Sequence, residues 1–488
     1  MHLAHIAEGI KAFWPHLVTG AVLCVDLFAA AHAVMYKRDS RSAIGWVGII
    51  WLVPLVGAVL YMLLGINRVK RRAATLRGGA TPGPRATSSH VCPTEALAET
   101  FRPDATHLVS LSRMVAELTE RPLLLGNRVE PLSSGDEAYA KMLKSIDEAR
   151  QSIGLSTYIF NNDRAGQMFV EALGRAVARG VEVRVLIDDI GARYTWPSIQ
   201  RKLRAAKVPL ARFLPTLVPS WSAYANLRNH RKLLVADGRI GFTGGMNIRE
   251  GHARQFKPKH FIEDLHFRLE GPIVAHLQEV FADDWAYTTD ELLQGEKWFA
   301  PLEPAGDVVA RGISAGPDGD YDKLHLTLLG AISCAKTSIS IVTPYFLPDD
   351  ALITALNVAA LRGVEVDVIL PEHNNLTLVK WASTAQLWQI LEHGCRVWMT
   401  PGPFDHTKVM LVDRAWSLFG SSNWDPRSLR LNFEFDVECY HLHLAERLGQ
   451  LVLQKRSQAR QIALADVDGR NLLARLRDGV ARLLTPYL

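Results

Sequence analysis

Asn229-His230-Arg231-Lys232-Leu233-Leu234-Val235-Ala236-Asp237 and Asp405-His406-Thr407-Lys408-Val409-Met410-Leu411-Val412-Asp413 are two copies of one pattern, and this pattern decides the fold. Each copy is followed at the same offset by Gly244-Gly245-Met246-Asn247 or Gly420-Ser421-Ser422-Asn423, so both read H-x-K-x4-D-x6-G-[GS]-x-N. A single H-x-K-x4-D arises by chance in roughly a few per cent of sequences of this composition. Two copies that share their trailing residues indicate an internal duplication.

Each motif belongs to a longer repeat of helices and strands. We predict the first helix of each half at residues 136–149 and 321–335, and the strands at 153–160, 183–187, 339–346 and 366–370. The second helix of each half ends in the same phrase, Arg179-Gly180-Val181-Glu182-Val183 or Arg362-Gly363-Val364-Glu365-Val366, and such glycines are typical of helix ends. This alternation predicts an α/β fold of two pseudo-symmetric α/β/α halves with a mixed sheet.

The two motifs are expected to meet in one cleft. A duplicated unit that folds with pseudo-two-fold symmetry brings its equivalent ends together at the interface of the halves. Each motif runs into a short apolar strand, 232–236 or 409–412, which turns at Asp237 or Asp413. Alternate side chains of an extended segment point to the same face. The spacing H-x-K therefore places an imidazole beside an ammonium group in each half.

These side chains are suited to binding a tetrahedral anion. Lys232 and Lys408 supply charge, while Asn247 and Asn423 supply neutral donors to nonbridging phosphate oxygens. One unprotonated imidazole can attack phosphorus to form a phosphoryl-enzyme intermediate. The other, when protonated, can donate to the leaving alkoxide and then act as a base. Because no carboxylate cluster suited to Mg²⁺ is present, we predict no metal or cofactor and expect the lysines to neutralise developing charge.

Two carboxylates are candidates for orienting the histidines. Glu434 lies 28 residues after His406, and Asp264 lies 34 residues after His230. The partner of one imidazole nitrogen fixes the tautomer of the ring, so a catalytic histidine needs such a group. The acidic residues that end the two motifs are open to a catalytic or a structural role; they are Asp237 and Asp413.

Two apolar runs open the chain. The second, residues 43–64, has 22 residues without a charge, which as a helix spans the ~30 Å hydrocarbon core of a bilayer. It contains Pro54, which membrane helices tolerate. The first run, 13–36, contains Asp26, interpreted as a hydrogen-bonded contact between helices. Together the runs predict a two-helix transmembrane hairpin within residues 1–72.

Basic residues are unequally distributed around these runs. The turn between them carries Lys37, Arg38 and Arg41, and the exit carries Arg68, Lys70, Arg71, Arg72 and Arg77. Because positive charge accumulates on the cytoplasmic side, we predict a multi-pass membrane protein whose large C-terminal part is cytoplasmic. The exit cluster is equally suited to attracting anionic lipid.

The remaining boundaries follow from composition. We predict a linker and approach segment at 73–135, with a Pro- and Gly-punctuated bridge at 121–135, then halves at 136–290 and 291–441, and a C-terminal helical segment at 442–488. The C-terminal segment is interpreted as amphipathic helix that packs on the α/β core or lies at the membrane. The net charge of +5 with no concentrated basic face predicts no nucleic-acid partner. Five scattered cysteines predict reduced thiols without a disulfide framework.

With its doubled H-x-K-x4-D, the chain resembles the phospholipase D superfamily and, within it, bacterial cardiolipin synthases of the phospholipase D type. The resemblance extends to the paired apolar spans and to four phrases: Tyr158-Ile159-Phe160, Arg228 to Asn247, Thr343-Pro344-Tyr345-Phe346-Leu347-Pro348, and the ending Ala481 to Leu488. It implies two phospholipase D-type halves in a protein of the bacterial inner membrane. It also implies that two phosphatidylglycerols give cardiolipin and glycerol through a phosphohistidine, with His230 as nucleophile and His406 as general acid/base.

Other functions remain open to the same motifs. A hydrolytic phospholipase D would use water as acceptor, and another phosphatidyltransferase would use a different donor or acceptor. A nuclease of the superfamily is disfavoured by the membrane hairpin and by the lack of an aromatic and basic strand-binding face. A scaffold with degenerate sites is disfavoured because His, Lys and Asn are intact in both copies. Gly245, where the second copy has Ser421, is not interpreted as a dead half-site.

Overall fold

The computed structural model describes residues 2–37, 40–65, 90–93, 96–98, 105–215, 227–317, 320 and 322–485. The chain divides into two compact units, Met1–Arg72 and Ala73–Leu488, which are considered separately below. Several sequence-based predictions lie outside the described residues: the linker around 78–84, the basic residues from Arg68 to Arg77, Arg38, and the last three residues.

The N-terminal unit holds one long apolar helix. Helix α1 spans His2–Tyr36, and its part Phe13–Tyr36 is long and apolar enough to cross a membrane. The second apolar run is not one helix: α2 (Ser40–Leu52) is followed by α3 (Val56–Leu60) and a π turn at Tyr61–Gly65. Among the described residues, α1 alone has the length and composition of a span, so the predicted two-helix hairpin is not confirmed.

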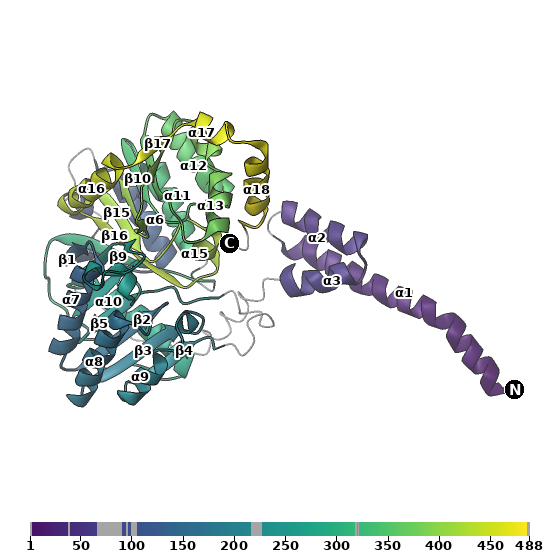
Figure 1. The fold of residues 1–488 in the computed structure, drawn as a ribbon, viewed down its shortest axis with the longest axis horizontal. Coiled ribbons are helices and arrows are strands. Elements are labelled where there is room, and N and C mark those ends of the chain that lie inside the picture. The colour runs from purple at the N-terminus through teal and green to yellow at the C-terminus, as the bar shows by residue number, and fades with distance from the viewer. Residues whose placement is uncertain are drawn as a thin grey trace. The chain divides into compact units, whose positions relative to one another are not determined.

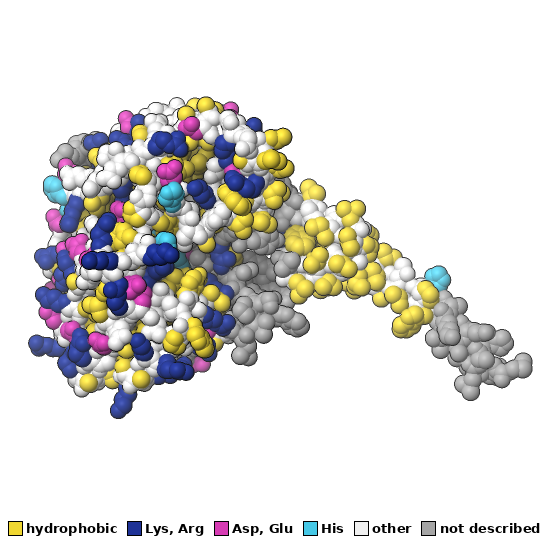
Figure 2. All heavy atoms as spheres, viewed as in Figure 1, with side chains coloured by type: hydrophobic (Ala, Val, Ile, Leu, Met, Phe, Trp, Pro, Cys, Tyr) yellow, Lys and Arg dark blue, Asp and Glu magenta, His cyan; other side chains and the backbone are white. Residues whose placement is uncertain are grey.

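Pro54 explains the break in the second run. A proline lacks the N–H that a helix interior needs, and its ring collides with the preceding turn. The next residue, Leu55, has a φ of 63°, and its N–H donates to the Asp26 carboxylate at 3.0 and 3.3 Å. The predicted polar contact of Asp26 is therefore present, and it satisfies the main chain at the break. Figure 2 shows hydrophobic side chains over most of the coloured part of this unit.

The second unit is built on one mixed sheet, part of which is visible in Figure 1. Among the described residues it has fifteen strands in the order β17-β12-β11-β10-β14-β15-β16-β9-β1-β8-β6-β5-β2-β3-β4. The first half contributes β1 (Leu124–Leu132), β2 (Ser152–Thr157), β3 (Glu182–Asp188), β4 (Leu210–Phe213), β5 (Leu233–Ala236), β6 (Ile240–Gly244) and β8 (His266–Glu270). The second contributes β9 (Val308–Ala315), β10 (Ser338–Val342), β11 (Glu365–Pro371), β12 (Arg396–Thr400), β14 (Val409–Val412), β15 (Trp416–Gly420) and β16 (Glu434–Tyr440), and β17 (Arg460–Ile462) extends its edge.

This strand order reads the same outward from the centre of the sheet. β1 and β9 pair antiparallel in the middle, and equivalent strands follow on each side. The outer strands β2, β3 and β4 run parallel, as do β10, β11 and β12. Each motif strand, β5 or β14, forms the predicted antiparallel hairpin with the next strand, β6 or β15.

Helices cover both faces of the sheet. The first half has α7 (Gly135–Glu148), α8 (Arg164–Ala178), α9 (Gln200–Ala205) and α10 (Val274–Thr289). The second has α6 (Leu108–Thr119), α11 (Lys323–Cys334), α12 (Asp350–Leu361), α13 (Thr377–Thr384), α14 (Trp388–Leu391) and α15 (Pro426–Arg430), followed by α16 (Leu442–Ser457), α17 (Leu464–Asp468) and α18 (Leu472–Leu483). Each half has its own apolar core, and a third core joins the halves, where Phe267 and Phe419 stack with ring centroids 3.6 Å apart.

Within the segment 73–135, the described residues 105–134 hold one helix, α6, and one strand, β1. The bridge predicted at 121–135 contains β1, a central strand of the sheet. Gly126 and Pro131 lie within this strand but do not end it. Gly126 has a φ of 82°, and a Cβ there would lie 2.8 Å from Pro304, so glycine is required at this bulge. Helix α6 packs on α11 of the second half. This segment therefore holds the two halves together.

Candidate active site

The main chain of each motif histidine is held by the other half. The N–H of His230 donates to the carbonyl oxygen of Phe433 at 2.9 Å, and the N–H of Phe433 donates to Arg228 at 2.8 Å. The N–H of His406 donates to Glu263 at 2.7 Å, where β13 (Phe404–Asp405) pairs in parallel with β7 (Ile262–Glu263). Two short backbone bridges thus cross the interface and bring both histidines to it.

The carboxylates that contact the histidines come across the same interface. His230 Nδ1 lies 2.9 and 3.0 Å from the two oxygens of Glu434, and His406 Nδ1 lies 2.8 Å from Asp264 Oδ2. Both predicted carboxylates therefore meet a motif histidine. The pairing suggested by nearness along the chain, Glu434 with His406 and Asp264 with His230, is not the one that the fold makes. The physical reason is that each carboxylate directly follows the segment whose backbone pairs with the opposite motif.

The two lysines lie buried beside the histidines. Lys232 Nζ donates to the carbonyl oxygen of His230 at 2.5 Å, and Lys408 Nζ donates to that of His406 at 2.6 Å. Burial, together with the charge of Lys408, lowers the pKa of Lys232 to about 7, and burial lowers the pKa of Lys408 to about 8. Since a bound anion favours the charged ammonium, a phosphate entering the site would raise both pKa values.

The pKa values of the imidazoles and carboxylates in the site are also shifted. Burial lowers the pKa of both motif histidines, and it holds that of His406 well below its usual value. Burial opposes ionisation of Glu434, but the attraction of His230 and its hydrogen bond outweigh burial and leave the pKa of Glu434 lowered. Burial raises the pKa of Asp264 to about 6. These shifts favour unprotonated imidazoles backed by carboxylates at neutral pH.

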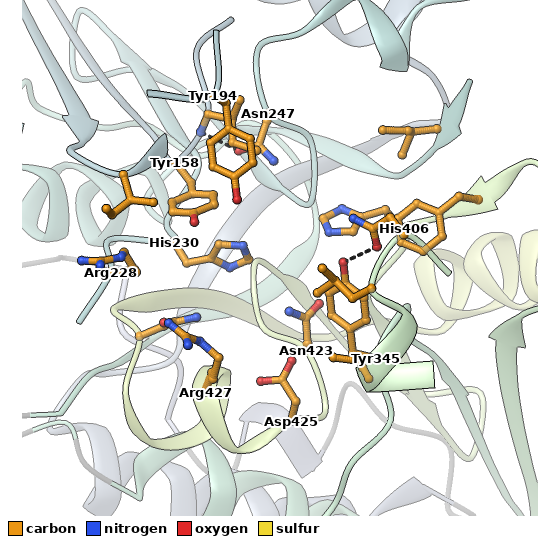
Figure 3. A pocket seen from close by; sticks show the side chains of 18 of the residues that line it. Tyr158, Tyr194, Arg228, His230, Asn247, Tyr345, His406, Asn423, Asp425 and Arg427 are labelled. Atoms are coloured by element: carbon orange, nitrogen blue, oxygen red, sulfur yellow. Dashed lines mark hydrogen bonds between the residues drawn. The ribbon is translucent and has the colours of Figure 1, made fainter. Parts of the chain in front are cut away.

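Both histidines face one cavity of about 680 Å³ between the halves (Figure 3). Tyr158 lies edge-on to His230 with ring centroids 5.2 Å apart, and Tyr345 lies edge-on to His406 at 6.2 Å. The predicted asparagines, Asn247 and Asn423, also line the cavity. The pseudo-symmetry of the sequence thus reappears as a two-sided pocket.

The asparagine amides are held in defined orientations. Asn247 Oδ1 accepts the N–H of Ile159 at 3.0 Å, which leaves its amide N–H₂ group as the donor to a ligand. Asn423 Nδ2 donates to Ser428 Oγ at 3.2 Å, using one of its two N–H bonds. Both amides can therefore still donate to an oxyanion in the cavity.

The motif aspartates do not reach this cavity. Asp237 accepts the N–H groups of residues 150–152, and Asp413 accepts those of residues 336–338. Asp413 also bonds His107 Nε2 at 2.6 Å. These carboxylates fix the loops that lead into β2 and β10, at the opposite end of the motif strands from the histidines. Of the two roles left open for Asp237 and Asp413, these contacts favour the structural one.

Gly245 and Ser421 differ because their facing carboxylates differ in length. A Cβ at Gly245 would lie 2.3 Å from Asp264 Oδ1, so the short aspartate leaves no room for a side chain. The longer Glu434 leaves room for Ser421, whose hydroxyl donates to it at 2.5 Å. The lack of a side chain at Gly245 therefore leaves room for Asp264, whereas the Ser421 hydroxyl donates a hydrogen bond to Glu434.

Introducing a side chain at this position is a direct test of that fit. Gly245→Ser should displace Asp264 from His406 and lower turnover by roughly 10- to 100-fold, the usual effect of disturbing a group that orients an active-site histidine. The matched change Ser421→Gly removes a donor without a collision, so its effect should be smaller. Steady-state rates of both variants, with thermal melts as a folding control, make the comparison. Full activity of Gly245→Ser would contradict the proposed steric role of this glycine.

The comparisons with known proteins agree with this architecture. A family model described as cardiolipin synthase, PLD-like domain, matches residues 142–285 and 328–454, and one described as phospholipase D-nuclease N-terminal matches residues 24–65. A cardiolipin synthase of Geobacillus kaustophilus is 31% identical, covering 98% of this chain and 96% of its own. A cardiolipin synthase 2 of Staphylococcus epidermidis is 30% identical, covering 97% and 98%.

The chain belongs to the phospholipase D-type cardiolipin synthase family. Members of this family are phosphatidyltransferases, so phospholipids are the substrate class and association with a membrane is expected. The solved structure of phosphatidylserine synthase from Haemophilus influenzae shares the fold, with a TM-score of 0.59 at 15% identity over 77% of this chain and all of that one.

Sequence reasoning missed several residues that line the cavity of this family member. They are Ile190, Tyr194, Arg228, Arg249, His252, Leu376, Leu378, Asp425 and Arg427. Arg228 adjoins the first motif, so its position was a usable signal. The others come from loops and helix ends that only tertiary structure brings together. Among the described residues, no three His, Cys, Asp or Glu side chains are grouped closely enough to bind a metal ion.

Proposed function

We propose that the protein transfers a phosphatidyl group from one phosphatidylglycerol to the headgroup hydroxyl of a second, releasing cardiolipin and glycerol. One observation carries this proposal: two carboxylate-backed imidazoles from opposite halves face one cavity, each beside a buried lysine. Such a pair supplies a nucleophile on one side of a phosphodiester and an acid on the other, as a two-step displacement requires.

In the first step, the Nε2 lone pair of His230 attacks phosphorus and forms a P–N bond. The P–O bond to the glycerol headgroup breaks, and His406, whose protonated form the bound anionic phosphodiester favours, donates its proton to the departing alkoxide. Glu434 holds the Nδ1–H of His230 and stabilises the positive charge that develops on the ring. Lys232 and Lys408, with the two cavity asparagines, neutralise and bind the nonbridging oxygens.

In the second step, the headgroup of another phosphatidylglycerol replaces glycerol. His406, now neutral, removes the proton of the acceptor hydroxyl as its oxygen attacks phosphorus. The P–N bond breaks and returns the electron pair to His230, and Asp264 steadies the His406 imidazolium. The enzyme regains its starting protonation state, and two phosphodiesters have become cardiolipin and glycerol.

The cavity lining supports a lipid acceptor. Arg228 and Arg427 are close to the His230 side of the cavity (Figure 3), where a guanidinium can bind the phosphate of a second anionic lipid. Apolar side chains such as Ile190 and Ile262 line other parts of the wall. A site that uses water as acceptor would bind the acyl chains of the donor in the same way but needs no contact to a second phosphate.

We also propose that residues 40–65 return across the bilayer to complete a membrane hairpin, with the α/β unit in the cytoplasm of a bacterial inner membrane. The bond from Leu55 to Asp26 supports this placement, because it satisfies the main chain where Pro54 breaks the second run. The asymmetry of basic residues between 37–41 and 68–77 supports the orientation. We further propose that the chain divides after residues 72, 135, 290 and 441, with the approach segment 73–135 supplying β1 to the first half and α6 to the second.

The experiment that tests the activity is incubation of purified full-length protein with phosphatidylglycerol in mixed micelles, followed by lipid mass spectrometry. Cardiolipin and glycerol in equal amounts are expected. Phosphatidic acid with glycerol would instead indicate a hydrolase. A parallel reaction with phosphatidylethanolamine as donor identifies a different phosphatidyltransferase, and the His230→Asn protein gives the background.

A further inference from the structure

Helix α18 turns its apolar side chains outward instead of toward the core. Leu473 and Leu476 are 78% and 62% exposed. The other exposed apolar side chains of this helix and its end are Leu472, Val480, Leu483 and Leu484. The buried positions are Asp478 and Ala481. In Figure 2, hydrophobic side chains gather at this edge of the α/β unit.

The exposed residues form one continuous stripe. At about 100° per residue, the six apolar side chains fall within an arc of about 120°, and the buried positions lie on the opposite side. Arg475 and Arg482 border one edge of the stripe, and Arg477 borders the other. A helix with an apolar outer face and basic margins is the pattern of an interfacial helix, which lies in the plane of a membrane surface.

The inner side of α18 is fixed to the wall of the active site. Asp478 accepts from Arg477 at 2.8 Å, and the Arg477 guanidinium lies 4.3 Å from the ring centroid of Trp381 in α13. Ala481 belongs to a small apolar cluster with Tyr345, the residue that lies edge-on to His406. The outer stripe is thus rigidly connected to one side of the cavity.

The rim of the cavity is apolar and exposed near this helix. Leu376 and Leu378, at the start of α13, are exposed and line the cavity. On the other half, Tyr194 lines the cavity, and nearby Trp196 is 96% exposed. Tryptophan and tyrosine at such positions favour the boundary between headgroups and acyl chains. Both sides of the opening therefore carry side chains suited to lipid.

We propose that the outer face of α18 docks on the headgroup–acyl boundary of an anionic phospholipid bilayer and holds the cavity mouth at the lipid surface. Soluble proteins rarely expose so continuous an apolar stripe, and a lipid-consuming site beside it selects a bilayer as the occupant. Arg475 and Arg482 would reach lipid phosphates while the leucines enter the acyl boundary. This inference rests on the proposed function only in taking phospholipid as the substrate.

Photolabelling of the full-length protein in lipid nanodiscs tests the docking without requiring catalysis. The bilayer contains phosphatidylglycerol, phosphatidylcholine and a phospholipid with a diazirine in its acyl chain, and labelled peptides are mapped by mass spectrometry. Peptides from 472–484 should be labelled several-fold more than the α12 peptide containing Leu361, which is 70% exposed. Equal labelling of the two would overturn the proposal. Cross-linking of α18 to a second copy of the chain would also overturn it, and assign the face to a protein interface.

A variant at three exposed positions measures the contribution to turnover. Combining Leu472→Gln, Leu476→Gln and Leu483→Gln should lower activity on phosphatidylglycerol vesicles by about tenfold and leave activity on monomeric short-chain phosphatidylglycerol unchanged. Leucine-to-phenylalanine changes at the same positions should preserve the vesicle rate. The matched control is Leu361→Gln with Leu453→Gln, two exposed leucines on other helices. Equal losses on both substrates would show a packing role and contradict docking.

Discussion

Changing His230 or His406 to asparagine is expected to reduce cardiolipin formation by roughly 10⁴-fold or more, because each side chain forms or breaks a bond that no neighbour can replace. Asparagine is preferred to alanine because its amide can still donate to the buried carboxylate. Alanine would leave Glu434 or Asp264 buried without its partner, which destabilises the fold itself. The measurement is product formation from phosphatidylglycerol by mass spectrometry, with circular dichroism as the folding control.

A substrate with a good leaving group separates the two roles. If 4-nitrophenol replaces glycerol in the phosphatidyl donor, departure needs no general acid. The His406→Asn protein should then still release a burst of nitrophenol equal to the number of sites, and the phosphatidyl group should remain on His230. The His230→Asn protein should give no burst.

The opposite pattern, a burst without His230 and none without His406, would reverse the assignment of nucleophile and acid. A burst in neither variant would contradict the covalent intermediate. The matched control is His443→Asn, because the His443 side chain is exposed and lies outside the cavity lining. Its burst and its steady-state rate should equal those of the unchanged protein.

The features that local sequence specifies were predictable. The spacing of His230 and Lys232 and the hairpin that follows them depend on neighbouring residues, and so does the helix-to-strand step at Gly180. In the structure these elements begin and end within a few residues of the predicted bounds. The fold of the second half could then be predicted from that of the first, since a repeated sequence pattern implies a repeated fold.

Features that depend on the partner of a segment were not predictable from one sequence. Gly126 and Pro131 resemble loop residues until the bulge between β1 and β9 is known. Nothing local to Pro54 indicates whether a membrane helix kinks there or stops, because the answer depends on the carboxylate of Asp26. The motif aspartates show a second limit of sequence reasoning. A repeated pattern does not tell which of its residues fix the neighbouring loops and which take part in the reaction.

The crossed pairing of carboxylates leads to the second large effect. Glu434→Gln should slow formation of the intermediate by roughly 10²- to 10⁴-fold, because the amide still occupies the space but no longer stabilises the His230 imidazolium. Asp264→Asn should instead impair the steps in which His406 gives and takes the proton. With the nitrophenyl donor, only the first variant should slow the burst.

Double-variant cycles decide whether the halves are coupled in this crossed manner. Because Glu434 lies within hydrogen-bond distance of His230, removing both should cost little more than removing either one. Glu434 makes no such bond to His406, so the fold-losses in rate caused by those two changes should multiply. Glu446→Gln, a change at an exposed carboxylate, is the matched control. Strong coupling of Glu434 to His406 would contradict the structure and favour pairing within each half. A crossed result would mean that neither half is catalytically complete alone, since each histidine depends on a carboxylate from the other repeat.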